Sequence, residues 1–264
     1  MDLDLQNFKV KKPKDKKIDL TNLGAFEKIL QMHGGATAME TKYDGYGVLI
    51  DNRSRNGDGL RLYSLSKNSW DVRGIPELAD DFSKLPAGFY VGEICGSPTH
   101  EGFTNREEFR AVSQRALRES ENRSSAELER MASKSPLQVR LYDILELKGK
   151  VLASLPNSEI RKYLEDTQIG GINPVDRRLI DDVEELQLLS CGLIFDGLEG
   201  VVVKDPNSSY SPRGQFVKGS RNDDWIKIKR QTTLDGVVLG LYQTPDRLRE
   251  GWACSNVLLG TLNS

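Results

Sequence analysis

The sequence predicts an α+β fold, in which helices flank sheets of mostly antiparallel strands. Short apolar segments with a two-residue alternation recur along the chain, and amphipathic segments with helix-capping residues interrupt them. Their order lacks the regular strand–helix–strand alternation of a doubly wound parallel sheet. The 264 residues, of which 38% are hydrophobic, suffice for one full-sized core and the beginning of a second small domain.

The first elements are expected close to the N-terminus. Residues 1–17 form a basic arm without clear periodicity, so folded structure should begin near Ile18. Thr21 can cap a helix over residues 22–32, which Gly34 and the glycine after it would end.

The following elements alternate between strands and helices. Thr104 with Glu107, and Ser124 with Glu127, form capping boxes that should each begin a helix. The remaining expected helices are 158–166 and 181–190, and the expected strands are 36–41, 46–51, 59–66, 89–94, 137–147 and 200–204, with a turn at Asp44-Gly45 between the first two.

Charge is distributed unevenly along the chain. The net charge of −2 argues weakly against a nucleic-acid partner, yet residues 9–17 carry +5 and residues 213–230 carry +4, which leaves −11 for the remainder. Lysines in such stretches can contact phosphates without reading sequence, although residues 9–17 can equally be a solvated tail.

Composition also excludes several classes of protein. No apolar run is long enough to span a bilayer and the N-terminus lacks a signal-peptide pattern, so we expect a cytoplasmic protein. The three cysteines, Cys95, Cys191 and Cys254, are far apart and favour thiols over a disulfide framework. With only two histidines in the chain, no zinc-ligand spacing is present.

A candidate nucleophile lies in the segment from Glu40 to Gly45. Lys42 follows an expected strand and precedes a glycine turn, which can project its amine into a cleft. To act as a nucleophile near neutral pH the amine must lose its proton, so other cations or burial must lower its pKa from about 10.4. Alone, this pattern is more typical of a surface turn.

Three further segments supply charge and an aromatic ring. Glu93 ends an apolar strand, Tyr142 lies within an aliphatic strand, and Lys204 closes an apolar run. The ring can stack on a base or pack in the core. A lysine after an apolar run points either to solvent or to a bound phosphate, because burial without an anion is costly.

The segment Trp225 to Lys229 alternates cationic and apolar residues. A strand would place Trp225, Lys227 and Lys229 on one face and both isoleucines in the core. Two neighbouring ammonium groups repel each other unless an anion lies between them, which suits a phosphate site. The alternative is an edge strand with solvated lysines.

In this order the segments resemble the covalent nucleotidyltransferase superfamily of ATP-dependent DNA ligases, RNA ligases and mRNA capping enzymes. The resemblance runs from roughly Met39 to Gly260 and is strongest to the small DNA ligases of bacteriophages. The matching motifs are I at Lys42–Gly45, III at Gly92-Glu93, IIIa at Tyr142-Asp143, IV at Glu199–Lys204 and V at Trp225–Lys229. It implies a nucleotidyltransferase (adenylation) domain over residues 18–232 and the start of an OB-fold domain, incomplete in length, over 233–264.

The resemblance also implies a reaction and roles for the site. Lys42 would attack the α-phosphate of ATP and carry AMP, which would pass to the 5′-phosphate of a nick in duplex DNA before the 3′-hydroxyl displaces it. The protein would act as a monomer. Glu40 would recognise the edge of the adenine, and Tyr142 would stack on the face of the adenine ring.

The remaining implied ligands are charged. Glu93 and Glu199 would hold the ribose and a Mg²⁺ or Mn²⁺ ion. Other nucleotide-binding candidates are Asp44, Gly45, Lys204, Lys227 and Lys229, and the three lysines would neutralise the α-phosphate and lower the pKa of Lys42. Glu199 and Lys204 are an odd number of residues apart, so a regular strand would point them to opposite faces unless Gly200 bends the backbone.

The sequence departs from the family pattern in two places. Relatives carry an arginine where this chain has Gly47, and the Ser-Arg motif of the next strand appears as Ser64-Leu65-Ser66-Lys67. The candidates for contact with DNA are therefore Arg53, Arg55, Arg61, Lys218 and Arg221.

Other functions stay open at this stage. An RNA ligase or a capping guanylyltransferase uses related motifs, although Glu40 and the OB-like start at Asp235 favour a DNA ligase. A catalytically weak relative that only binds nucleic acid is a further alternative, which the two absent arginines favour and the intact lysines and carboxylates oppose. NAD is not expected as the cofactor, because only 41 residues precede Lys42.

Overall fold

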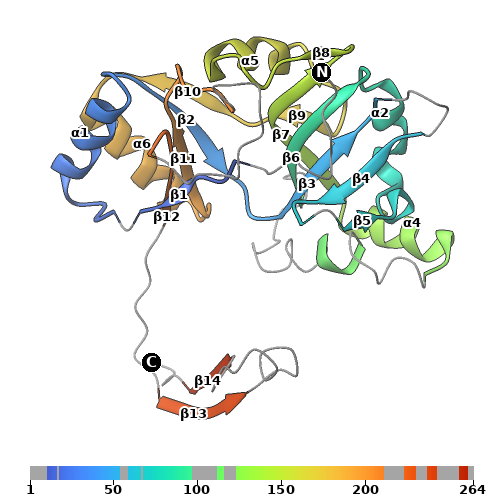
Figure 1. The fold of residues 1–264 in the computed structure, drawn as a ribbon. Coiled ribbons are helices and arrows are strands. Elements are labelled where there is room, and N and C mark those ends of the chain that lie inside the picture. Colours follow the sequence, from blue (N-terminus) through green and yellow to red (C-terminus); the bar gives the residue numbers. More distant parts are fainter. Residues whose placement is uncertain are drawn as a thin grey trace. The chain divides into compact units, whose positions relative to one another are not determined.

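The chain divides into two compact units, Met1–Lys229 and Arg230–Ser264, whereas the expected boundary followed residue 232. The computed structural model describes residues 11–16, 18–53, 59–66, 68–96, 112–115, 123–210, 223–229, 237–242 and 256–260. The fold is α+β with mainly antiparallel strands, as predicted (Figure 1).

One sheet of the first unit has five strands in its described part. Their order is β1 (Lys14–Asp15), β12 (Trp225–Lys229), β11 (Gly200–Lys204), β2 (Thr37–Lys42) and β10 (Arg177–Ile180). Neighbouring strands are antiparallel, except that β1 runs parallel to β12. Helices α1 (Leu23–Met32) and α6 (Val183–Phe195) lie side by side against this sheet (Figure 1).

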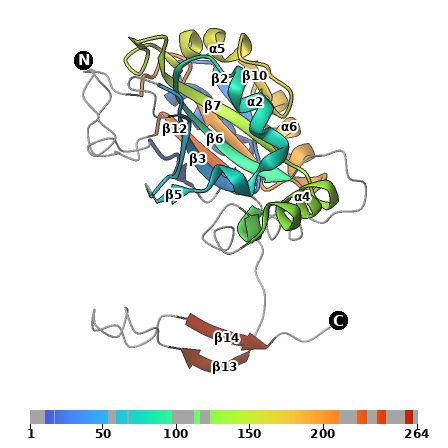
Figure 2. The same cartoon turned by 90° about the vertical axis from the view of Figure 1, so that its right-hand side faces the viewer.

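The second sheet of this unit has seven strands in the described residues. Their order is β5 (Ser69–Trp70), β4 (Arg61–Ser64), β3 (Tyr46–Asp51), β6 (Gly88–Gly96), β7 (Leu137–Leu147) and β8 (Lys150–Val151), with β9 (Ile172–Pro174) parallel to β7. Around it lie α2 (Ala79–Lys84), α4 (Ser125–Lys134) and α5 (Asn157–Glu165), and the short 3-10 helices η1 (Val72–Gly74) and η2 (Pro76–Leu78) precede α2 (Figure 2).

Among the described residues, three clusters of buried side chains hold the first unit together. One joins the seven-stranded sheet to residues such as Phe82 and Ile160 of its helices. A second packs Phe26 of α1 and Leu186 of α6 against the five-stranded sheet. The third contains Leu49 and Val91 of one sheet together with Trp225 of the other, so apolar contacts join the two sheets directly.

The passage from β2 to β3 differs from a simple hairpin. The chain bends at Gly45, but the expected turn does not join paired strands, because β2 belongs to the five-stranded sheet and β3 to the seven-stranded one. Lys42, the last residue of β2, therefore lies where the chain crosses between the sheets.

Two expectations for the N-terminal part are wrong. Folded structure does not begin near Ile18, because Lys11 is buried and β1 pairs with β12. Thr21 does not cap α1. The residue before the helix is Asn22, which makes no capping hydrogen bond, and the Thr21 hydroxyl donates to Asp19 instead.

The other local expectations agree well where the structure describes them. Ser124 caps α4 by accepting the backbone N–H of Glu127, and α6 begins close to the expected residue 181. Most of the helix expected from Thr104 lies outside the described residues. Its described part, residues 112–115, is helical. Cys95 and Cys191 are thiols, and Cys254 lies outside the described part. None of the described helices is long and apolar enough to cross a membrane.

The described residues of the second unit form a two-stranded antiparallel sheet of β13 (Val237–Tyr242) and β14 (Asn256–Gly260). Both strands fall where the sequence predicts the beginning of an OB-fold.

Candidate active site

Three neighbouring strands of the five-stranded sheet bring the predicted lysines onto one face. In the register, Gly200 lies between Lys42 and Lys229, and Val202 lies between Glu40 and Lys227. The alternate residues of these strands, including Met39, Val201 and Ile228, face the helices and form the core. The predicted alternation of β12 is thus confirmed, and it exposes its lysines on the side away from α1 and α6.

Gly200 leaves room for a carboxylate between two lysines. The Nζ atom of Lys42 is ion-paired with Glu199, whose other oxygen lies 3.9 Å from Nζ of Lys229. Gly200 has φ = 148°, a conformation that residues with a side chain rarely adopt, and a Cβ there would approach the backbone oxygen of Ile228 to 2.0 Å. The predicted bend at Gly200 is therefore present, and it turns Glu199 toward the face that bears Lys204.

A cavity of about 250 Å³ opens beside this face. Its wall from the five-stranded sheet includes Glu40, Lys42 and Lys227, and its wall from the seven-stranded sheet includes Glu93 and Tyr142. The complete lining is Lys11, Lys12, Pro13, Glu40, Thr41, Lys42, Tyr43, Leu65, Glu93, Tyr142, Val175, Val202, Lys204, Trp225 and Lys227. Ligand sites are commonly concave, with apolar walls and a few converging polar groups.

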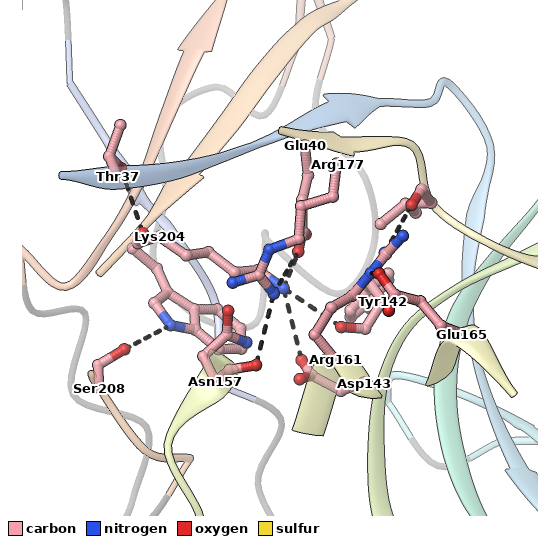
Figure 3. Close-up of polar contacts among 12 residues, drawn as sticks. Thr37, Glu40, Tyr142, Asp143, Asn157, Arg161, Glu165, Arg177, Lys204 and Ser208 are labelled. Atoms are coloured by element: carbon pink, nitrogen blue, oxygen red, sulfur yellow. Dashed lines mark hydrogen bonds and ion pairs between the residues drawn. The ribbon is translucent and has the colours of Figure 1, made fainter. Parts of the chain in front are cut away.

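Lys204 is buried beside the cavity rather than directed to solvent. Its side chain points toward Glu40 and Asp143 (Figure 3). Its Nζ lies 2.8 Å from the carboxylate of Glu40 and donates a hydrogen bond of 3.3 Å to the backbone oxygen of Tyr142. Arg177 approaches the same Glu40 carboxylate at 3.7 Å. Glu40 and Lys204, which were predicted to contact the nucleotide separately, therefore form an ion pair with each other. This pairing neutralises both charges in the interior.

Asp143 completes this buried cluster. Its carboxylate lies 3.8 Å from Nζ of Lys204, and neither oxygen has a hydrogen-bond partner among the described residues. Burial raises the pKa of Asp143 to about 6, and the positive charge of Lys204 opposes that rise.

Two aromatic rings border the charged groups. Nζ of Lys204 lies 4.3 Å from the centre of the Trp225 ring and 5.6 Å from that of Tyr142. Tyr142 lines the cavity, where the resemblance implies that its ring stacks on a base. Val202, between Glu40 and Lys227 in the register, adds an apolar surface.

The carboxyl groups near Lys42 influence one another. Burial raises the pKa of Glu93 to about 8, Lys42 opposes the rise, and Glu199 and Asp44 add to it. Burial and Glu199 likewise raise the pKa of Asp44. A cation placed among these groups would relieve their mutual repulsion.

The donor set agrees with a Mg²⁺ ion held partly by a substrate. Within the described part of the chain, no group of three or more histidine, cysteine or acidic side chains could hold a metal by itself. Mg²⁺ is usually bound by one or two carboxylates together with phosphate oxygens and water. Glu93 and Glu199 fit that smaller contribution.

Two glycines near Lys42 lie in close packing, Gly45 against backbone and Gly47 against a leucine side chain. A Cβ on Gly45 would lie 2.1 Å from the backbone oxygen of Ile94, and a Cβ on Gly47 would lie 2.4 Å from a methyl group of Leu65. The two departures from the family pattern, at Gly47 and at Leu65, are therefore in contact. Leu65 fills the space that an arginine side chain at position 47 would enter.

The structure separates the candidates for contact with DNA. Arg53 forms ion pairs with Asp51 at 2.7 Å and Glu146 at 3.3 Å, and its side chain is 12% exposed. It therefore stabilises the far end of β3, and the expectation that it contacts DNA is not supported. Arg61 is exposed on β4. Arg55, Lys218 and Arg221 lie outside the described residues.

Motif reasoning missed the N-terminal contribution to the site. Lys11, Lys12 and Pro13 line the cavity, and Asp15 lies 3.1 Å from Lys227 and 3.6 Å from Lys229. The only sequence signal for these residues was the charge of the stretch 9–17, which fits a solvated tail equally well. Asp143, which belongs to the matched motif IIIa but was given no role, and Arg177, which lies in none of the motifs, also join the site.

The two sheets, with a lysine at their junction and a cavity bordered by cations and an aromatic ring, define a nucleotidyltransferase domain. Residues 20–229 match the model of the family described as ATP dependent DNA ligase domain. The chain belongs to this family.

Individual relatives agree with this assignment. DNA ligase 1 of Methanosarcina mazei is 32% identical over 231 residues, which cover 83% of this chain and 38% of that protein. A probable DNA ligase of Mycobacterium marinum is 31% identical over 240 residues, covering 90% of this chain and 42% of that protein. The chain thus spans about two fifths of the length of these relatives.

A solved structure shares the fold. The ATP-dependent DNA ligase from bacteriophage T7, in complex with ATP, has a TM-score of 0.54 at 20% identity, over 97% of this chain and 81% of that chain.

Proposed function

We propose that this chain forms the adenylation domain of an ATP-dependent DNA ligase, in which Lys42 carries AMP covalently. The observation that carries the proposal is the position of Lys42, which lines a cavity, touches Glu199 and lies across Gly200 from Lys229. We also propose that the protein acts as a cytoplasmic monomer on nicked duplex DNA.

The first step would be attack of Lys42 on ATP. Deprotonated Nζ forms a bond to the α-phosphorus, the bond from that phosphorus to the bridging oxygen of the β-phosphate breaks, and pyrophosphate leaves with the electron pair. Glu199 contacts Nζ and is placed to accept its proton.

The surrounding groups would bind and stabilise the nucleotide. Tyr142 and Val202 offer surfaces for the base, with the Glu40–Lys204 pair beside them. Lys227 and Lys229 would neutralise charge on the phosphates. A Mg²⁺ or Mn²⁺ ion at Glu93 and Glu199, when bound, would offset further negative charge.

The two later steps would act on DNA. The 5′-phosphate of a nick attacks the phosphorus of lysyl-AMP and the P–N bond breaks, which returns the electron pair to Lys42. The 3′-hydroxyl then attacks the DNA 5′-phosphorus and loses its proton to solvent. The phosphodiester bond forms as the bond from that phosphorus to the bridging oxygen of AMP breaks, and AMP leaves with the electron pair.

The decisive experiment is intact mass spectrometry after incubation with ATP and Mg²⁺. We expect one added AMP on the wild-type chain and none on Lys42→Ala, because alanine lacks the nucleophile. Lys28→Ala, which removes an exposed lysine of α1, serves as the control and should form the adduct normally. Absence of any adduct on the wild-type chain at high ATP would favour a binding module instead.

Two further assays with the same protein distinguish a DNA ligase from an RNA ligase and from a capping-type guanylyltransferase. Sealing of nicked DNA with ATP supports the proposal, whereas preference for nicked RNA indicates an RNA ligase. Preference for GTP in the adduct assay indicates a capping-type guanylyltransferase.

A further inference from the structure

Residues 11–16 lie before the part of the chain that matches the family model, yet they are anchored against the candidate site. The backbone N–H of Lys11 donates to the Tyr210 hydroxyl at 2.7 Å, and its buried Nζ donates to the backbone oxygen of Ser209 at 2.9 Å. The same Nζ lies 3.3 Å from Asp224 and 4.7 Å from the centre of the Trp225 ring. This end of the segment is therefore fixed by backbone, ionic and aromatic contacts.

The other end of the segment is fixed by strand pairing. Lys14 and Asp15 pair in parallel with Ile226 and Lys227 of β12. Lys14 and Lys16 both contact Asp223, at 3.0 and 2.8 Å. Between these two anchors the backbone of Lys12 and Pro13 has little freedom, and Pro13 restricts it further by fixing its own φ.

Lys12 differs from the other lysines of the cavity. Lys11, Lys42, Lys204 and Lys227 are each ion-paired with an acidic residue. Lys12 lines the same cavity and is exposed, and no described residue forms a hydrogen bond or ion pair with its ammonium group. Among the lysines of the described lining, Lys12 is therefore the one that forms no ion pair with an acidic side chain.

The wall near Gly47 supplies no such charge. Leu65 fills the space beside Gly47, so an arginine side chain is absent from this part of the lining. A site for a polyanion that lacks a cation in one place gains from an unpaired cation in another, because each ammonium group stabilises phosphate oxygens at short range.

We infer that Lys12 is a phosphate-binding residue of this site, held in place by the anchors at Lys11 and β1. The inference rests on the proposed function and extends it to a segment outside the family match. Its ligand is a phosphate group, which can belong to ATP or to the 5′ end of a DNA nick.

The first arm of the test measures nucleotide affinity by calorimetry. All proteins carry Lys42→Ala, so that no covalent adduct forms. We expect Lys12→Ala to weaken ATP binding by about fivefold and to leave adenosine binding unchanged, since only ATP carries phosphates. Lys12→Arg should restore ATP binding, and Lys28→Ala should not alter it.

The second arm compares two nicked duplexes that differ only in the presence of the 5′-phosphate. If Lys12 serves the DNA phosphate, Lys12→Ala weakens binding to the phosphorylated nick and leaves the unphosphorylated one unaffected. A change confined to either arm supports the inference and identifies the source of the phosphate.

The inference is overturned if Lys12→Ala behaves like Lys28→Ala in both arms. Point variants are preferable to deletion of residues 1–17, which would also remove Lys11 and β1 and disturb Trp225. Failure of this inference is distinguishable from failure of the proposed function, because the AMP adduct on the otherwise wild-type chain does not depend on the Lys12 comparison.

Discussion

Glu93 shows how one buried side chain couples the site to pH. Its carboxyl group lies near Lys42, Glu199 and Asp44, and burial raises its pKa to about 8 from an ordinary value of 4.5. Without a bound cation the folded protein therefore holds a proton on Glu93 at a pH where the unfolded chain has lost it.

The sign of the effect on stability follows from proton binding. Between pH 4.5 and about 8 the folded state binds more protons at this position than the unfolded state, so raising the pH destabilises the fold. The contribution of Glu93 to the free energy of unfolding is fully present below pH 4.5 and is lost as the pH rises through about 8.

We predict that Glu93→Gln removes this dependence. Urea unfolding of the wild type and the variant should be compared across the range from about pH 5 to pH 9. The stability of the wild type relative to the variant should fall as the pH rises. Parallel stability curves would show that Glu93 titrates normally in the folded protein.

At the scale of elements, the conformation of β11 depends on its first residue. Gly200 has φ = 148° and packs directly against the backbone of β12, which allows Glu199 to reach Lys42. A larger residue would have to move β12 and with it the pair Lys227 and Lys229.

We predict that Gly200→Ala destabilises the protein by about 2–4 kcal/mol, since it combines an unfavourable φ with a backbone clash. Gly192→Ala is the matched control. Gly192 lies within α6 with no atom within 4 Å of its would-be Cβ, so alanine there should stabilise by about 0.5–1 kcal/mol.

Chemical denaturation of both variants measures these differences directly. Equal stabilities of Gly200→Ala and the wild type would mean that the bend at residue 200 does not require glycine. If the Gly200→Ala protein is folded but forms no AMP adduct, the bend also positions Glu199 and Lys42 for the reaction.

At the scale of the whole molecule, each of the three hydrophobic clusters belongs to the first unit. Their buried residues range from Ile18 to Ile228. In the second unit, the described side chains of Val237, Val238, Leu239 and Leu241 are 58–67% exposed. An isolated two-stranded sheet is only marginally stable.

We predict that a chain ending at Lys229 keeps its cooperative unfolding transition, with a melting temperature within about 3 °C of the full chain. Residues 230–264 alone should show no cooperative transition. Differential scanning calorimetry of the three proteins provides the comparison, and a drop of the melting temperature by ten degrees or more would show that the second unit contributes to the core.

The tertiary structure also explains the uneven charge along the chain. The two basic stretches, 9–17 and 213–230, are far apart in the sequence, but β1 lies beside β12 in the sheet (Figure 1). Asp15 lies close to both Lys227 and Lys229, so acidic residues within the stretches offset part of the repulsion.

The sequence by itself determined the elements whose character is local. The predicted bounds of β3, β7, β11 and β12 agree with the structure, because apolar runs and alternation with a period of two residues are properties of each segment alone. The same alternation placed Lys227 and Lys229 opposite the core, and the order of the motifs brought Lys42, Glu93, Tyr142 and Lys204 into one set before any geometry was known.

Only the tertiary structure decided which segments meet. It assigned β2 and β3 to different sheets, joined Lys204 to Glu40, committed Arg53 to Asp51 and Glu146, and placed residues 11–16 in the cavity wall. These contacts join residues that are distant in the sequence, and their partners are selected by packing and charge balance across the whole unit. No local pattern encodes that selection, because the same lysine-rich segment is equally compatible with solvent until an acidic and aromatic surface forms beside it.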